Sequence, residues 1–308
     1  MKSAHLLAIL LTSCLVAILA ACLLGSTPMG LSQVFKALLG QSTAGDNIVV
    51  WEIRLPRALA AFVVGAALGA SGAALQGLLR NPLAEPGVLG VSATSSLSAT
   101  FALLATALLA AAAVRVKSVV TLILIGVGLS SFSASIMSLL LNLAPNPFSL
   151  ADMMNWLLGS VANRSFLDLQ TTVPFIAVGL LILFASRRGL SALTLGDEAA
   201  SGIGLNLHRQ RIAVVLGAGL ATGAAVALAG AIGFVGIVAP HIIRPFVNYD
   251  PARSLLPSAL LAGLILVLAD ILVRLMPTNT ELKLGVVAAL IGAPAFIWIA
   301  MQRRVTYD

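Results

Sequence analysis

The run from Ala58 to Leu79 contains no ionisable residue. As an α-helix, which rises about 1.5 Å per residue, it is long enough to cross the hydrocarbon core of a bilayer. A span that faced lipid would carry Leu, Ile and Phe all round. Here small residues recur near helical spacing, which lets other helices approach closely: Gly65, Gly69, Gly72 and Gly77. We therefore expect this helix to be surrounded by protein.

The rest of the chain has a similar composition. Of its 308 residues, 59% are hydrophobic and 9% are charged, and the mean hydropathy is +1.06. A soluble domain has about a quarter of its residues charged, so the sequence predicts an all-α, polytopic membrane protein. The net charge of +7 does not indicate nucleic-acid binding, because the basic residues lie in short loops between apolar runs, as the positive-inside rule expects.

The apolar runs predict about ten transmembrane helices, with both termini in the cytoplasm. Residues 1–24 have two interpretations: a cleaved signal, because Leu19-Ala20-Ala21-Cys22 resembles a lipoprotein cleavage site, or a first span. We favour the span, since the polytopic remainder needs no cleaved signal. A short interfacial helix is expected at 31–39. The expected spans are 1–24, 58–79, 88–112, 118–143, 150–162, 171–185, 212–231, 237–247, 255–275 and 284–301.

An internal repeat is visible in two stretches, 65–90 and 217–244. Each has a Gly-rich helix, a turn broken by Gly or Pro, and a second helix, with Gly65 and Gly217 equivalent. The first copy would run from outside to inside and the second from inside to outside, which is an inverted-topology repeat. We expect one transmembrane domain over 1–308, with repeat halves at about 54–163 and 212–302.

The most polar internal segment begins at Leu195, shortly after the basic pair Arg187-Arg188. It is too polar to span a membrane, and the basic pair marks the cytoplasmic side. Asp197 and Glu198 suit the N-terminus of a helix, where the macrodipole favours negative charge. We expect two short cytoplasmic helices at about 193–209.

Ordered motifs extend from about residue 51 to residue 298. The first is R-x-P-R at 54–57, followed by G-A-x-L-x-x-S-G, a glutamine, and R-N-P-L-A-x-P-x-x-L-G. Later ones are Trp156-x-x-Gly159-Ser160, Leu195-Gly196-Asp197 and Pro240-His241-Ile242-x-Arg244. Together they resemble the FecCD-type permeases, the membrane subunits of ATP-driven importers for iron-siderophore, haem or vitamin B12.

This resemblance implies a permease subunit that takes such a substrate from periplasm to cytoplasm across a bacterial inner membrane. It implies a second copy of the chain as partner, two cytoplasmic ATP-binding subunits, a periplasmic substrate-binding protein and the lipid bilayer. No phosphate-binding G-x-x-x-x-G-K-[ST] loop occurs in the sequence. ATP hydrolysis is therefore expected on the separate subunit, and this chain is expected to be no enzyme and to carry no cofactor.

The residue pattern and the resemblance together predict three sites, the gate from Pro-containing breaks at 81–83 and 145–147, of which the resemblance supports the first better than the second. Those expected to dock the binding protein are Arg54, Arg57 and Arg274. Those expected to contact the ATPase are Leu195, Gly196, Asp197, Glu198 and Gly204. Those expected at the cytoplasmic gate are Asn81, Pro82, Leu83 and Asn146. The arginines have a second interpretation, as anchors of helix ends in the headgroup layer. The sequence departs from the family pattern in the loop at 248–253 and at Lys283, where a proline is usual.

Other functional classes fit less well. An ion-coupled secondary transporter, the alternative, would normally carry mid-span charges, and the spans here almost lack them. A membrane enzyme would need a nucleophile–base pair or a metal cluster. His241 has no Cys or second His at metal spacing, so we expect no metal site. Asp270 and Arg274, four residues apart, form either a local ion pair or part of a docking surface. Siderophore, haem and cobalamin all remain open as substrates.

Overall fold

A computed structural model describes residues 2–25, 27–86, 119–144, 146–276 and 281–302. Every regular element in these ranges is a helix, as the sequence predicts. The predicted span 88–112 lies outside the described residues. The α-helices are α1 (Lys2–Leu23), α2 (Leu31–Leu38), α3 (Ala44–Asn47), α4 (Leu55–Leu78), α7 (Val119–Asn142), α8 (Pro147–Leu158), α9 (Phe166–Ala185), α10 (Arg187–Ala192), α11 (Asp197–Gly202), α12 (Leu207–Ala229), α13 (Val235–Ile243), α14 (Pro251–Leu275) and α15 (Leu284–Gln302).

Six helical stretches in the described residues are long and apolar enough to cross a membrane. Two shorter apolar helices accompany them, at Val235–Val247 and Leu284–Ile297. The count of ten spans and the inverted repeat therefore stay predictions. The six are Ala4–Leu23, Ala44–Leu78, Leu124–Asn142, Phe166–Ala185, Leu207–Ala229 and Pro251–Leu275.

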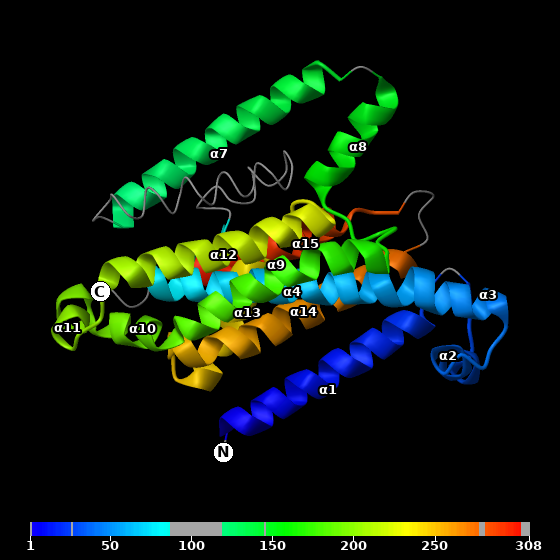
Figure 1. Cartoon of the computed structure of the whole chain (residues 1–308), viewed down its shortest axis with the longest axis horizontal. Helices are drawn as coiled ribbons and strands as arrows, with labels where there is room; N and C mark the ends of the chain where they lie inside the picture. Colours follow the sequence, from blue (N-terminus) through cyan, green and yellow to red (C-terminus); the bar gives the residue numbers. More distant parts are fainter. Residues whose placement is uncertain (1, 26, 87–118, 145, 277–280, 303–308) are drawn as a thin grey trace.

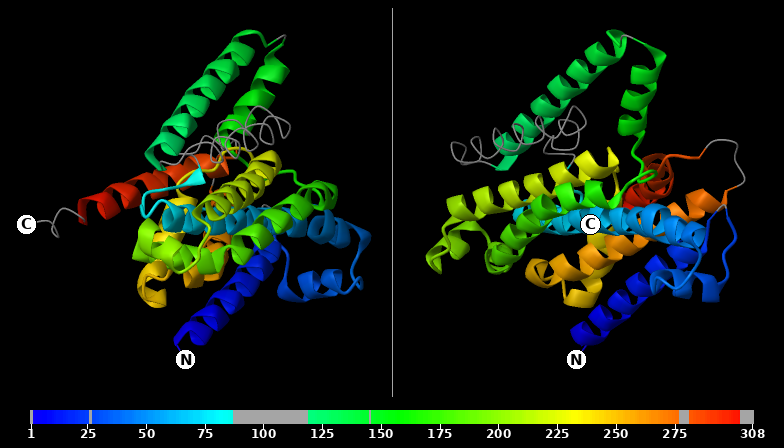
Figure 2. Two further views of the ribbon diagram at one scale, coloured as in Figure 1. Left: turned by 60° about the vertical axis from the view of Figure 1, so that its left-hand side comes forward. Right: turned by 45° about the vertical axis from the view of Figure 1, so that its right-hand side comes forward.

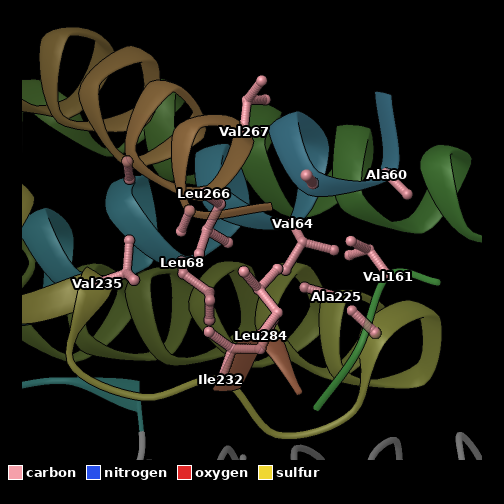
Figure 3. Packing of buried hydrophobic residues seen from close by; sticks show 14 of the residues in the cluster. Ala60, Val64, Leu68, Val161, Ala225, Ile232, Val235, Leu266, Val267 and Leu284 are labelled. Atoms are coloured by element: carbon pink, nitrogen blue, oxygen red, sulfur yellow. The ribbon is translucent and has the colours of Figure 1, made fainter. Parts of the chain in front are cut away.

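Helix α4 lies along the middle of the bundle, beside α12, α13 and α14 (Figure 1). The short helix α3 and the π-helical turn η1 (Ile48–Arg54) come directly before α4 and lead into it without a break. The prediction that protein surrounds this helix is confirmed, because its residues are buried along most of its length. Side chains that meet there are small or aliphatic, such as Val64 and Leu68 against Leu266 of α14 (Figure 3).

Glycines set how closely the neighbours approach α4. A Cβ atom added at Gly69 would lie 2.3 Å from the carbonyl oxygen of Ser258 in α14. One added at Gly72 would lie 1.9 Å from the carbonyl oxygen of Gly236 in α13. Real Cβ atoms do not come so near, so only glycine permits these backbone contacts. The small residues seen in the sequence are thus packing surfaces for helices on two sides.

The hairpin of α7 and α8 leans away from this bundle (Figures 1 and 2). The sequence predicts that the span at 118–143 returns to the inner face. In the structure α7 starts near the end of the bundle that carries α10 and α11, and its far end joins α8 at the tip of the hairpin (Figure 1). It therefore runs away from the α11 end, whereas the prediction has it run towards the inner face. Among its described side chains, α7 buries few, including Ser133 and Met137, so packing against the bundle contributes little to its direction.

Three spans begin about four or five residues earlier than the apolar pattern predicts, because polar residues cap them. Ser165 and Asp168 form a reciprocal capping box at the start of α9. The Asn206 side chain accepts a hydrogen bond from the Arg209 N–H at the start of α12. Asp250 accepts one from the Ala252 N–H at the start of α14. Residues 207–209, expected in the short cytoplasmic helices, therefore belong to α12.

Candidate functional site

One end of the bundle carries α10, a single 3₁₀ turn (Leu193–Leu195) and α11 (Figure 1). Asp197, the first residue of α11, connects this end to two long helices. Its Oδ1 accepts a hydrogen bond of 2.8 Å from Arg80 Nη2, just beyond α4. Its Oδ2 accepts one of 2.8 Å from Arg211 Nη2 in α12. Asp197 therefore fixes α11 to two helices that cross the bundle.

Two glycines shape the chain on either side of α11. Gly196 has φ +96° and Gly204 has φ +90°, which are backbone conformations that residues with a Cβ rarely adopt. Nothing lies within 4 Å of a Cβ added at Gly204, so its requirement for glycine is conformational. These turns present α11 at the end of the molecule.

The surface around α11 is unusual for a polar end because the residues that flank the helix expose large apolar side chains. Leu195 is 64% exposed and Ile203 is 66% exposed. Glu198, also exposed, lies between them in sequence. All five residues predicted to contact the ATPase thus lie in or next to one short helix, with Ile203 beside them. Ile203 is not among the residues predicted from the sequence, although an isoleucine between two glycines in a polar segment is a usable signal.

The turn after α4 holds three of the predicted gate residues. The Asn81 side chain accepts a 3.0 Å hydrogen bond from the Leu83 N–H, and the Asn81 N–H donates to the carbonyl oxygen of Gln76. Pro82 is buried and Asn81 is exposed. A cavity of about 280 Å³ lies beside this turn. Its lining includes Arg244, which donates a 2.6 Å hydrogen bond to Gln76 Oε1.

Asn146 lies elsewhere. It belongs to the turn between α7 and α8, at the tip of the hairpin that leans out of the bundle (Figure 1). The structure therefore does not bring Asn146 together with the Asn81 turn. The predicted Pro-containing break itself is present, since α7 ends at Asn142 and α8 starts at Pro147.

Glu85 joins the same turn after α4 to the start of α13. Its Oε2 accepts a 3.3 Å hydrogen bond from the N–H of Phe234, the residue that precedes α13. Phe234 has φ +66°, a left-handed conformation for a residue with a side chain. Burial raises the pKa of the Glu85 carboxyl, and the hydrogen bond from Phe234 opposes that rise in part. This carboxylate is not among the site residues predicted from the sequence.

The three predicted docking arginines come together at the opposite end of the bundle, around a cavity of about 260 Å³. Arg57 donates from Nε (2.9 Å) and Nη2 (2.8 Å) to Oδ1 of Asp270, which is 1% exposed. It also pairs with Glu281. The Oδ2 atom of Asp270 lies 3.1 Å from Arg274 Nε, in an ion pair without good hydrogen-bond geometry. Asp270 and Arg274 thus form the local pair that the sequence suggests, with Arg57 as a third member.

The other two arginines of this cluster contact the C-terminal end of α1 and the residues just after it. Arg54, only 4% exposed, donates to the carbonyl oxygens of Cys22 (2.9 Å) and Leu23 (2.8 Å), and also to that of Thr27. Arg274 donates to the carbonyl oxygen of Ala21 (3.0 Å). The last carbonyl groups of a helix have no partner within it and carry its negative dipole end. The two arginines therefore cap α1.

Within the described residues, no group of three or more His, Cys, Asp or Glu side chains is placed to hold a metal ion. The sites are instead a helix surface at one end and an arginine cluster at the other, on a bundle of membrane-length helices.

Comparison with known proteins identifies this arrangement. The sequence pattern of the FecCD transport family matches residues 13–116 and 100–302. The chain belongs to the FecCD transport family. The resemblance drawn from the motifs is thus confirmed, and the chain is a multi-pass membrane protein of this FecCD type.

Relatives of this FecCD chain cover most of its length. It is 36% identical over 299 residues to the uncharacterized ABC transporter permease protein YvrB of Bacillus subtilis, covering 88% of this chain and 84% of that protein. It is 40% identical over 283 residues to the vitamin B12 import system permease protein BtuC of Vibrio cholerae, covering 84% of each. It is 34% identical over 312 residues to YfiZ of Bacillus subtilis, named as a probable siderophore transport system permease, covering 94% of this chain and 93% of that protein.

A solved structure has the same fold. It is a metal-chelate type ABC transporter in an inward-facing conformation, and it matches with a TM-score of 0.87 at 27% sequence identity. The match covers 97% of this FecCD chain and 99% of the solved chain.

Proposed function

We propose that this FecCD chain is the permease subunit of an ABC importer for metal chelates of the siderophore, haem or cobalamin type. Two copies form the pathway in a bacterial inner membrane, with both termini in the cytoplasm. Two ATP-binding subunits drive transport from the cytoplasm, and a periplasmic binding protein delivers the substrate. The names of the relatives support this class of substrate. The observation that carries the proposal is the exposed apolar surface around α11.

The geometry of α11 suits the transmission of force. The apolar side chains on either side of it, Leu195 and Ile203, are exposed where a cytoplasmic subunit would bind, and burying them would stabilise a complex. Asp197 then connects the helix to the end of α4 and the start of α12 through two charge-assisted hydrogen bonds. A displacement of α11 by the ATP-binding subunit would thus reach both long helices directly.

The test separates binding from coupling. In coexpression with the cognate ATP-binding subunit, I203D should abolish copurification, because a buried unpaired carboxylate is costly. The matched control is L39D, a leucine 70% exposed at the end of α2, which should copurify normally. D197N should copurify but move less substrate per ATP hydrolysed. Normal copurification and uptake with I203D would show that α11 is not the coupling surface.

The second candidate, an ion-coupled secondary transporter, is separated from the first by its energy source. Asp270, a buried acid in the described spans, lies at the arginine cluster and is already paired with two arginines. Its carboxylate is therefore not available to bind a coupling ion. Uptake in proteoliposomes should require ATP on the side of α11 and should persist when ion gradients are collapsed.

We also propose that the arginine cluster receives the binding protein. Arg54 and Arg274 are occupied by α1, so Arg57 is the member whose partner can exchange. Its contact with Asp270 is buried, whereas Glu281 is 39% exposed. A docking carboxylate would replace Glu281, so E281Q should speed docking by about two- to five-fold, as expected for one surface ion pair. R57Q should slow it and flatten its salt dependence. Unchanged docking kinetics in both variants would leave the cluster a structural anchor.

The gate is proposed at Asn81, Pro82 and Leu83, with Asn146 as a second element. Non-helical backbone is tolerated near a membrane only against protein or a water-filled space, and a cavity does lie beside the first turn. Asn146 would reach it only if the α7–α8 hairpin closed onto the bundle or onto the second copy. N81C and N146C should each cross-link to the same residue across the dimer axis in at least one nucleotide state; no cross-link in any state would remove both from the gate.

A further inference from the structure

A third cavity, of about 350 Å³, is distinct from both the α11 surface and the arginine cluster. Its lining comes from the end of α8, the loop before α9, the end of α12 and the residue before α15. The residues that line it are Trp156, Ser160, Ala162, Asn163, Arg164, Ala229, Gly230 and Lys283.

The wall of this cavity is rigid, because three chain segments are joined there by backbone hydrogen bonds. The Ser160 N–H donates to Ala229 O (2.7 Å), the Ala231 N–H to Trp156 O (3.1 Å) and the Gly285 N–H to Gly159 O (3.1 Å). The close approach requires glycine: a Cβ added at Gly159 would lie 2.3 Å from Ala231 O. A wall held in this way does not need to be ordered when a ligand arrives.

The charge of the cavity is positive. Arg164 and Lys283 are half-buried, and no ion pair joins either of them to a carboxylate within the described residues. Of the nearest acids in sequence, Asp168 interacts electrostatically with Arg164 without forming an ion pair, and its hydrogen bonds come from the Ser165 N–H and hydroxyl. Glu281 pairs with Arg57. In addition, Arg164 Nε is buried without a hydrogen-bond partner.

We propose that this cavity binds an anionic edge of the transported chelate, most simply its carboxylates, as the chelate enters the permease. The two cations would neutralise the carboxylates, the Ser160 hydroxyl can donate a further hydrogen bond, and the Trp156 indole offers an apolar face. A volume of about 350 Å³ is at the small end of ligand sites and suits part of a large chelate. The inference rests on the proposed import function and narrows its substrate to a negatively charged class.

The experiment uses a pair of probes that differ only in charge. The full chain in lipid nanodiscs is titrated with iron(III) protoporphyrin IX and with its dimethyl ester, and quenching of tryptophan fluorescence is followed, with empty nanodiscs subtracted. The dicarboxylate should bind about ten-fold or more tightly than the ester, because it gains charge-assisted hydrogen bonds. Its affinity should fall as salt is raised.

Variants then place the binding in the cavity. K283Q and R164Q should each weaken dicarboxylate binding by about five-fold or more, and K36Q, which removes an exposed lysine of α2, should leave it unchanged. K283Q keeps the test valid if R164Q fails to fold. Equal binding of acid and ester, or no effect of K283Q, overturns the proposal. The proposal is also overturned if K283Q changes only the docking of the binding protein and leaves dicarboxylate binding unchanged. Because no ATP-binding subunit is present, failure here is distinct from a failure of ATP-driven uptake.

Discussion

Gly204 holds a backbone conformation that the surface around α11 requires. At φ +90° with open space around its Cβ position, an alanine would meet no neighbour and would be strained only through its own backbone. G204A should therefore destabilise the α11 turn by about 1 kcal/mol and lower the binding of the ATP-binding subunit. G202A is the matched control: it also has open space, at an ordinary φ, and should be neutral or slightly stabilising. Equal binding affinities for the two variants would contradict this.

Glu85 should make stability depend on pH. Its pKa is raised in the folded protein by burial, so the folded state holds its proton more strongly than the unfolded state. Stability is then greater below the ordinary pKa of a glutamate and falls as the pH rises towards the raised value. E85Q, which resembles the protonated carboxyl, should melt at a higher temperature than wild type at pH 7, with the difference vanishing at low pH. Melting curves from pH 4 to pH 8 check this; a pH-independent difference would contradict it.

Some residues of the sites were predictable from sequence and others were not. Asp197 and the glycines around α11 lie in a polar segment between apolar runs, so the neighbouring sequence is enough to single them out. The partners of Arg57 are not local: Asp270 is 213 residues away along the chain. Charge alone cannot pair residues at that distance, because the pairing depends on α4 and α14 lying side by side. For the same reason the sequence could suggest that the arginines either dock a partner or anchor helix ends, but not that Arg54 and Arg274 would donate to the carbonyl groups of α1.

At the scale of elements, α4 depends on glycine where other helices meet it. A Cβ at Gly72 would lie 1.9 Å from a carbonyl oxygen of α13, and backbone cannot move as easily as a flexible side chain. G72A should therefore cost about 2 kcal/mol or more, measured as a lower melting temperature in detergent. G128A in α7 is the control, since nothing lies within 4 Å of its added Cβ; it should be neutral or stabilising. Equal losses in the two variants would mean that α4 is not closely packed in solution.

The elements themselves were largely predictable because long apolar runs have few alternatives to a helix in a membrane. What the apolar pattern missed were the helix starts. Ser165, Asn206 and Asp250 extend α9, α12 and α14 into polar sequence by capping their first turns. Those signals were present in the sequence as Ser, Asn and Asp before the apolar runs. The lean of the α7–α8 hairpin had no such signal.

At the scale of the whole molecule, charge differs between the two ends of the bundle. The end around α11 carries an excess of arginine, including Arg80, Arg187, Arg188, Arg209 and Arg211. The end around α2 and the arginine cluster carries acids that nearly balance its cations, including Asp46, Glu52, Asp270 and Glu281. Since positive loops stay in the cytoplasm, α11 should face the cytoplasm and α2 the periplasm.

This orientation can be measured with two single cysteines. Ser201 in α11 and Gln41 after α2 are both exposed, and the native Cys14 and Cys22 are free but buried, so the background labelling should be low. A maleimide that cannot cross membranes should label Q41C from the outside of spheroplasts and S201C only in inside-out vesicles. The reversed pattern would place the coupling surface on the side without ATP. It would therefore contradict both the predicted orientation and the proposed role of α11.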